Sequence, residues 1–134
     1  MKNVVANAVF VKDNKVLLEK RKKDEDNYAG LWSFPGGHRE KTETIEEALH
    51  REMKEELKVT IVTHKAIGEF DDIDPTSKEP YYHHFFLCTK WIGEITETTE
   101  EEGIRWVELR EIPKLGNVSK TTLNVLEKLK EEIK

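Results

Sequence analysis

A predicted helix in the middle of the chain carries acidic residues where its apolar face should lie, and this feature constrains the fold most. Ile45, Ala48 and Leu49 define one side of the helix at about 100° per residue. Glu52 and Glu56 fall within about 20° of the direction of Ile45 and should therefore point inward. Two carboxylates without partners on a buried face would each cost several kcal/mol. The pattern therefore predicts a bound divalent cation.

The spacing of the acids also indicates which cation binds. Glu55 lies toward the edge of the face that carries Glu52 and Glu56, so it can join the site. Carboxylates offer hard oxygen ligands, which suit Mg²⁺ or Mn²⁺ better than zinc. Because magnesium also binds phosphates well, a nucleotide diphosphate is a physically sensible ligand. Arg51 points away from these acids on the helical wheel, and we expect it to pair with Glu43 or another acid and brace the preceding loop.

Composition limits the classes of partner. The chain has 134 residues and 37% apolar content, which fits one domain over residues 1–134. A net charge of -5 provides no basic field for a nucleic-acid polymer. The basic run at 20–23 is followed at once by acids, so a solvated turn and a contact to substrate phosphates are both open. The lone Cys88 fits a reducing compartment. No stretch approaches the roughly 18 apolar residues of a membrane helix, so we expect a cytoplasmic protein that binds no membrane.

Apolar and β-branched runs separated by turn residues predict several strands. The first two should form a hairpin that turns at Asp13–Asn14. Pro35–Gly37 should stop a third, short strand, because the proline sets the backbone and the glycines admit close approaches that a side chain would block. The predicted strands are residues 4–11, 15–20, 31–34, 59–62, 66–70, 84–91 and 104–109, and the predicted polar loops are residues 22–30, 71–80 and 94–103.

Two helices are predicted, well separated along the chain. Thr44 caps the first, and Glu47 returns the hydrogen bond in a capping box. This helix should end near Leu57. Ser119 can cap the second helix, whose apolar stripe should consist of Leu123, Leu126, Leu129 and Ile133. Strands with two such helices favour a mixed sheet covered on both faces.

The segment from Gly37 to Val59 closely resembles the sequence box of the Nudix hydrolase family, G-x5-E-x7-R-E-U-x-E-E-x-G-U, in which U is a bulky apolar residue. Eight of the nine specified positions agree. The departure is Lys58, where the family usually has a glycine that would help the helix to end. All the acids of the box are retained. The matching residues are Gly37, Glu43, Arg51, Glu52, Met53, Glu55, Glu56 and Val59.

The resemblance implies an α/β architecture, the Nudix fold, which is an α/β/α sandwich with a mixed β-sheet. It also implies a metal site. Glu52, Glu55 and Glu56 would ligate the metal, and Gly37 would lend its backbone carbonyl. The alternative implied by MutT-like members is that Glu52 instead orients or deprotonates the attacking water. Glu43 and Arg51 would have structural roles.

The resemblance implies further site residues outside the box. Many members add a glutamate from a late loop, for which Glu102 is preferred here and Glu101 comes next. Arg21 corresponds to an arginine that holds a phosphate in many relatives, although a surface role is nearly as compatible with the sequence. His38 stands where some relatives carry a phosphate-directed lysine, and a plain loop role is equally open. The candidate catalytic residues are Glu52, Glu55 and Glu102.

The activity implied is Mg²⁺- or Mn²⁺-dependent hydrolysis of a nucleoside diphosphate linked to another group. A small MutT-like nucleoside triphosphate pyrophosphohydrolase is the leading interpretation, with an oxidised nucleotide as one candidate substrate. ADP-ribose pyrophosphatase activity is the alternative, because Pro75 lies sixteen residues after Val59, at the spacing that marks that branch. A sensor that binds nucleotides without cleaving them is the third interpretation, which the intact acids disfavour. A homodimer is compatible with the family, although no apolar stripe demands one.

Overall fold

The computed structural model describes residues 3–98 and 103–132, which form one mixed sheet with helices on both of its faces. The helices are α1 (Ile45–Leu57), the 3₁₀ helix η1 (Leu109–Lys114) and α2 (Lys120–Glu132). The strands are β1 (Val4–Lys12), β2 (Lys15–Lys20), β3 (Trp32–Ser33), β4 (Gly36–His38), β5 (Thr60–Ile73), β6 (Pro80–Ile92) and β7 (Gly103–Glu108).

Strand β1 is the centre of the sheet and connects its two halves. It pairs in parallel with β6, from Val4 opposite Tyr82 to Phe10 opposite Cys88. On its other side, β1 pairs antiparallel first with β4 and then, across the predicted hairpin turn, with β2. Strand β2 in turn pairs with β3 and β7, while β5 lies at the far edge beside β6. The sheet is therefore mixed, as predicted.

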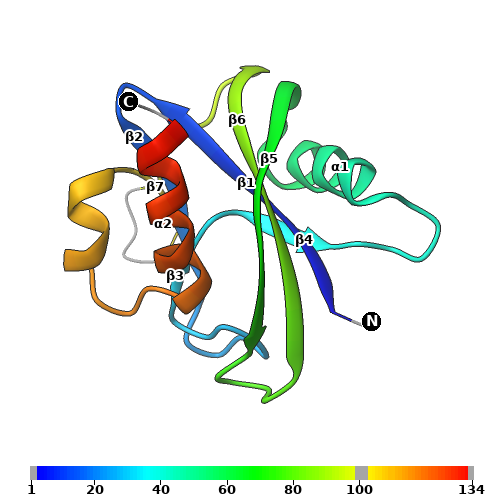
Figure 1. Cartoon of the computed structure of the whole chain (residues 1–134), viewed down its shortest axis with the longest axis vertical. Coiled ribbons are helices and arrows are strands. Elements are labelled where there is room, and N and C mark those ends of the chain that lie inside the picture. The colour runs from blue at the N-terminus through cyan, green and yellow to red at the C-terminus, as the bar shows by residue number, and fades with distance from the viewer. Residues whose placement is uncertain (1–2, 99–102, 133–134) are drawn as a thin grey trace.

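The two faces of the sheet carry separate cores because side chains alternate along each strand. Ala6, Ala8 and Phe10 of β1 pack toward α1, whereas Val9 packs toward α2. Figure 1 shows α1 and α2 on opposite sides of the strands. This arrangement confirms the predicted α/β/α sandwich.

The strand boundaries differ from the sequence prediction around β5. Residues 59–62 and 66–70 were predicted as two strands, but Thr60–Ile73 is one strand that pairs with β6 throughout. The register between β5 and β6 shifts around Thr63 and between Ala66 and Gly68. These shifts interrupt the alternation of side chains between the two faces of the sheet while β5 stays paired with β6. The predicted loop over 71–80 is likewise wrong at its ends, because Asp71 and Asp72 extend β5 and only 74–79 connect it to β6.

Helix α2 begins as predicted, and its buried face includes the predicted Leu126 and Leu129 but not Leu123. The Ser119 hydroxyl accepts a hydrogen bond from the backbone N–H of Thr122 at 3.3 Å, which caps the helix start. Leu123, predicted to belong to the buried stripe, is 41% exposed, and Ile133 lies outside the described residues. The buried face is made of Thr121, Thr122, Val125, Leu126 and Leu129. The small threonines suit it because this end of α2 reaches the polar cavity described below.

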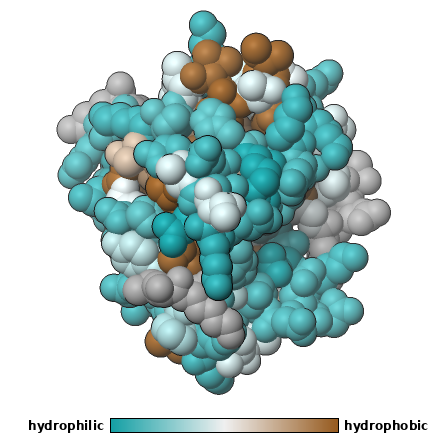
Figure 2. Space-filling model, turned by 90° about the vertical axis from the view of Figure 1, so that its right-hand side faces the viewer, coloured by the Kyte–Doolittle hydropathy of each residue, from teal (hydrophilic) through white to brown (hydrophobic). Residues whose placement is uncertain are grey.

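Helix α1 has well-defined ends. The Thr44 side chain accepts from the backbone N–H of Glu47, and the Glu47 carboxylate accepts from the backbone N–H of Thr44, so the predicted capping box is present. At the other end Lys58 adopts a left-handed conformation, with φ of 60°. The side of the molecule that carries α1 is mostly hydrophilic, with hydrophobic residues gathered at its upper end (Figure 2). Within the described parts of the chain, no helix is long and apolar enough to cross a membrane.

Candidate active site

The candidate site forms where β4 passes against α1. Strand β4 is held in place by β1, with Gly37 opposite Ala6. The backbone of Gly37 faces the Glu52 carboxylate so closely that an added Cβ would lie 2.1 Å from Glu52 Cδ. Only glycine permits this approach, as predicted for the paired glycines. Gly36 is equally confined, since an added Cβ would lie 2.5 Å from the Ala6 carbonyl oxygen.

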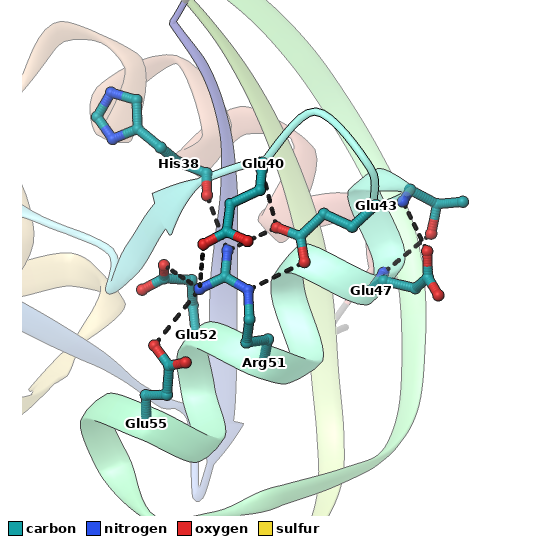
Figure 3. Close-up of polar contacts among 8 residues, drawn as sticks. His38, Glu40, Glu43, Glu47, Arg51, Glu52 and Glu55 are labelled. Atoms are coloured by element: carbon teal, nitrogen blue, oxygen red, sulfur yellow. Dashed lines mark hydrogen bonds and ion pairs between the residues drawn. The ribbon is translucent and has the colours of Figure 1, made fainter.

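Arg51 fastens the loop between β4 and α1 to the helix (Figure 3). Its Nε donates to Glu43 Oε2 at 2.9 Å and its Nη2 donates to the His38 carbonyl oxygen at 3.0 Å. Its Nη1 donates to Glu52 Oε1 at 2.8 Å. The hydrogen bond from Arg51 lowers the pKa of Glu43 to about 2. The predicted pairing of Arg51 with Glu43 is therefore present. Arg51 also contacts a second acid, Glu52, because its flexible side chain reaches past its own direction on the helical wheel.

The acids of α1 are less buried than the helical wheel predicts. The Glu52 side chain is 16% exposed and that of Glu55 is 60% exposed, while Glu56 also reaches solvent. The core face of α1 is made only of Ala48, Leu49 and Met53. The acids lie at the margin of this face. Only Glu52 is enclosed, by Gly37 and Arg51.

Glu19 of β2 joins the acids and was not predicted. Burial raises its pKa to about 7, and the charges of Glu25 and Glu52 act in the same direction. Burial of the carboxyl group likewise raises the pKa of Glu56 to about 8, with Glu19 and Glu52 contributing. Strand alternation could have found Glu19, since it lies two residues after Leu17, which packs in the core beside α1.

A divalent cation fits this cluster. The pKa values of Glu19 and Glu56 are raised mainly by burial and further by neighbouring acids, and a cation would stabilise the charged carboxylates against both effects. Within 3–98 and 103–132, no three acidic, histidine or cysteine side chains are close enough to enclose an ion by themselves. Mg²⁺ does not need such a cage, because it usually binds one or two carboxylates, several waters and substrate phosphates. The oxygen donors therefore suit Mg²⁺ or Mn²⁺.

A cavity opens beside Gly37 and continues toward α2. Arg21 and His38, both predicted as substrate-binding residues, line this cavity. The Arg21 guanidinium is already engaged, since Nε donates to the Asn27 carbonyl oxygen at 2.8 Å and Nη2 donates to Asn27 Oδ1 at 2.7 Å. The His38 ring points away from Arg51 (Figure 3) and contacts the Tyr81 ring edge-on. The remaining polar lining is Asn7, Glu19, Tyr28, Ser33, His83, Ser119, Thr121 and Thr122.

A buried hydrogen-bond chain forms one wall of this cavity. Asn7 Nδ2 lies 3.1 Å from His83 Nδ1, and the Tyr28 hydroxyl lies 3.0 Å from His83 Nε2. The same hydroxyl donates to Asp72 Oδ2 at 3.0 Å. Burial lowers the pKa of His83 to about 4, so its imidazole is neutral at neutral pH. Sequence patterns give no signal for this chain because its members are 44 to 76 residues apart.

The late-loop acids predicted for the site, Glu101 and Glu102, lie outside the described residues. The flanking residues Thr98 and Gly103 line a second groove, together with Glu56 and Arg21. Glu19 lines both this groove and the cavity beside Gly37. Arg21 also lines both, so the two hollows meet at Glu19 and Arg21.

Comparison with known proteins identifies relatives of this chain. A family model described as the NUDIX domain matches residues 1–129. The chain is 30% identical over 113 residues to the ADP-ribose pyrophosphatase of Methanocaldococcus jannaschii, covering 84% of this chain and 66% of that protein, just under two thirds of its length. It is 32% identical over 99 residues to the 8-oxo-dGTP diphosphatase of Proteus vulgaris, covering 71% of this chain and 82% of that protein.

A solved structure shares the fold over nearly the whole chain. The MutT NUDIX hydrolase from Burkholderia pseudomallei superposes with a TM-score of 0.81 at 27% sequence identity. The match covers 96% of this chain and 98% of that chain. The arrangement of sheet and helices is therefore one that already occurs in a MutT hydrolase.

Proposed function

Because this chain belongs to the Nudix family of pyrophosphohydrolases, we propose that it is a MutT-like nucleoside triphosphate pyrophosphohydrolase. The reaction adds water across the phosphoric anhydride and releases a nucleoside monophosphate and pyrophosphate. Mg²⁺ or Mn²⁺ is the proposed cofactor. The observation that carries the proposal is the enclosure of Glu52 between Gly37, which lines the first cavity, and Arg51, beside Glu56, which lines the second groove.

The acids of α1 have different proposed roles. Glu52 and Glu56 hold the metal together with the Gly37 carbonyl, and the more exposed Glu55 completes the set. When bound, the metal supplies positive charge that neutralises the bridging phosphate oxygens. Arg51 fixes Glu52 Oε1 at 2.8 Å, which leaves Oε2 directed toward Gly37. Glu43 keeps Arg51 in place from the opposite side.

A carboxylate must also take the proton of the attacking water. Glu52 is the first candidate because its position is fixed from two sides. Glu55 of the family box and Glu102 of the late loop are the other candidates. General-base catalysis of this kind contributes roughly 10²- to 10⁴-fold in rate.

The hollows beside the acids suggest how a nucleotide is placed. The cavity between Gly37 and α2 offers aromatic and polar groups for a nucleoside, including Tyr81, His83 and Thr121. The second groove is bordered by Arg21 and Lys22, whose positive charges suit the departing phosphates. The diphosphate would then cross Glu19 and Arg21, which line both hollows, and pass beside Glu56.

A substrate panel tests the proposal directly. The protein is incubated with Mg²⁺ and NTPs, oxidised dNTPs, ADP-ribose or dinucleoside polyphosphates, and the products are identified by chromatography. We expect a nucleoside monophosphate and pyrophosphate from at least one triphosphate, and no product when the metal is chelated. Release of orthophosphate alone, or binding without cleavage throughout the panel, would overturn the proposal, the latter in favour of a nucleotide sensor.

ADP-ribose pyrophosphatase activity is the second candidate, favoured by the 30% identity to the Methanocaldococcus jannaschii protein. The same catalytic residues would cleave ADP-ribose into AMP and ribose 5-phosphate. The two candidates differ in what the second groove receives, a pyrophosphate or a sugar phosphate. Comparison of kcat/KM for ADP-ribose and for the best triphosphate decides between them.

A further inference from the structure

We propose that His50 and His64 form a second metal site for a divalent cation that prefers imidazole, with Zn²⁺ as the best fit. His50 belongs to α1 and His64 to β5. His50 Nε2 and His64 Nδ1 lie 3.3 Å apart, and the ring centroids are 5.1 Å apart. The proposed catalytic function does not use either residue.

The separation of the two nitrogens matches a tetrahedral metal. With Zn–N bonds of about 2.0–2.1 Å and a tetrahedral angle, two ligating nitrogens lie about 3.3 Å apart. A square-planar or octahedral centre with the same bond lengths would bring them to about 2.9 Å. The 3.3 Å of the hydrogen bond in the metal-free pair already equals the spacing that a tetrahedral Zn²⁺ requires.

The surroundings allow an ion to enter. His64 is exposed and His50 is half-buried. The His64 ring rests edge-on against the buried Phe86, with centroids 5.6 Å apart, which limits its position without closing the site. For both lone pairs to meet at one ion, the rings must tilt by about 35° from the line that joins the nitrogens. The exposed ring of His64 can make most of this adjustment, and water can complete the coordination.

The protonation of the pair is also suitable. Burial and the neighbouring His64 lower the pKa of His50, which favours the neutral ring that a metal requires. At present one ring nitrogen donates its hydrogen to the other. On metal binding, the donor ring changes tautomer and carries that hydrogen on its other nitrogen, so no net proton is lost.

The experiment is a Zn²⁺ titration by calorimetry in saturating Mg²⁺, which occupies carboxylate sites but binds imidazole poorly. Wild type is compared with His50→Gln, His64→Gln and the double variant, which sets the background from other sites. His84→Gln is the control, because His84 lies on β6 and contacts Glu69 instead. We expect each single variant to lose at least about tenfold in Zn²⁺ affinity, the double variant to lose little more, and the control to bind normally.

Two outcomes would overturn this site. One is wild-type affinity in both single variants. The other is an equal loss in His84→Gln. A second measurement identifies the atoms: in ¹⁵N spectra of the histidine rings, Zn²⁺ should shift the signals of His50 Nε2 and His64 Nδ1 together. A shift of one ring without the other would exclude the proposed chelate. Neither result depends on whether the protein hydrolyses nucleotides.

Discussion

Glu52 has a different neighbour at each carboxylate oxygen. Oε1 accepts a hydrogen bond from Arg51, and Oε2 lies against the backbone of Gly37. This double contact fixes the carboxylate in one orientation before any ligand binds, which reduces the reorganisation needed for catalysis. Glu56 lacks such a clamp, and its pKa is raised mainly by partial burial of the carboxyl group and further by the negative charges of Glu19 and Glu52. The two acids are therefore expected to respond differently to substitution.

Glu56→Gln should abolish most Mg²⁺-dependent turnover while the fold stays intact. The amide is nearly the same size but cannot offer a charged oxygen to a metal, so kcat should fall by about 10²-fold or more. Steady-state kinetics across Mg²⁺ concentrations, with circular dichroism as the check on folding, measure the effect. Glu46→Gln, at the exposed start of the same helix, is the matched control and should retain activity. Near-normal activity of Glu56→Gln would show that the ligand assignment is wrong.

At the scale of the elements, β4 and α1 act together because Gly37 lets them approach. The loop between them is closed by Arg51, which contacts Glu43 and the His38 carbonyl. The helix end is set by Lys58, whose left-handed conformation replaces the glycine that is usual in the family. Each of these local features can be tested by changing one residue.

Gly37→Ala should remove activity by displacing Glu52. The new Cβ would lie 2.1 Å from Glu52 Cδ, so the carboxylate must leave its position or β4 must shift. We expect a loss of about 1–3 kcal/mol in the free energy of unfolding, together with weaker Mg²⁺ activation. Chemical denaturation and kinetics measure the two effects.

Gly116→Ala separates displacement of Glu52 from a general cost of losing a glycine. Gly116 has φ of 67° and no atom within 4 Å of an added Cβ. The variant should lose about 1 kcal/mol of stability through backbone strain and keep full activity. If Gly37→Ala behaved like Gly116→Ala, the contact with Glu52 would have no role in catalysis.

Lys58→Gly should be more stable than Lys58→Ala by about 1 kcal/mol, because only glycine adopts a φ of 60° without strain. Both variants lose the contact in which Lys58 Nζ donates to the Glu55 carbonyl oxygen at 2.8 Å. The difference in stability between the two variants therefore measures only the cost of the left-handed backbone conformation at residue 58. Thermal and urea unfolding measure the difference, and equal stability of the two variants would contradict the left-handed helix end.

At the scale of the whole molecule, the crowded acids make stability depend on pH in the metal-free protein. The pKa of Glu56 is about 8 in the folded chain against an ordinary value of 4.5, so the folded state holds this proton more tightly. Stability therefore falls as pH rises from about 4.5 to 8. A divalent cation replaces the proton and should remove the effect.

The stability difference between Glu56→Gln and wild type isolates this contribution. In the presence of a chelator, the variant should gain stability relative to wild type as pH rises from about 4.5 to 8, because glutamine does not titrate. Urea unfolding at several pH values measures the difference. In saturating Mg²⁺ the stability difference should change sign, because only the wild-type protein has the Glu56 carboxylate that binds the metal. A stability difference between Glu56→Gln and wild type that does not change with pH would contradict the raised pKa of Glu56.

Local sequence was sufficient for the parts of the fold that depend on short spacings. The capping box at Thr44, the hairpin between β1 and β2 and the pairing of Arg51 with Glu43 each involve residues within one element or its neighbours. The sandwich could be predicted for the same reason, because the number and spacing of strands and helices leave few packings. The strand limits of β5 could not, since its irregular register depends on pairing with β6.

The sequence by itself determined that acids gather on one helix that follows a pair of glycines. The helical repeat of 3.6 residues and the small size of glycine are local properties that can be read from short spacings. Only the tertiary structure brought Glu19 from β2 to Glu56, set His83 between Asn7 and Tyr28, and left Glu55 in solvent. These positions follow from which strand lies beside which and from how the helix packs against the sheet. Such positions are fixed by packing across the whole chain, and no short spacing in the sequence encodes them.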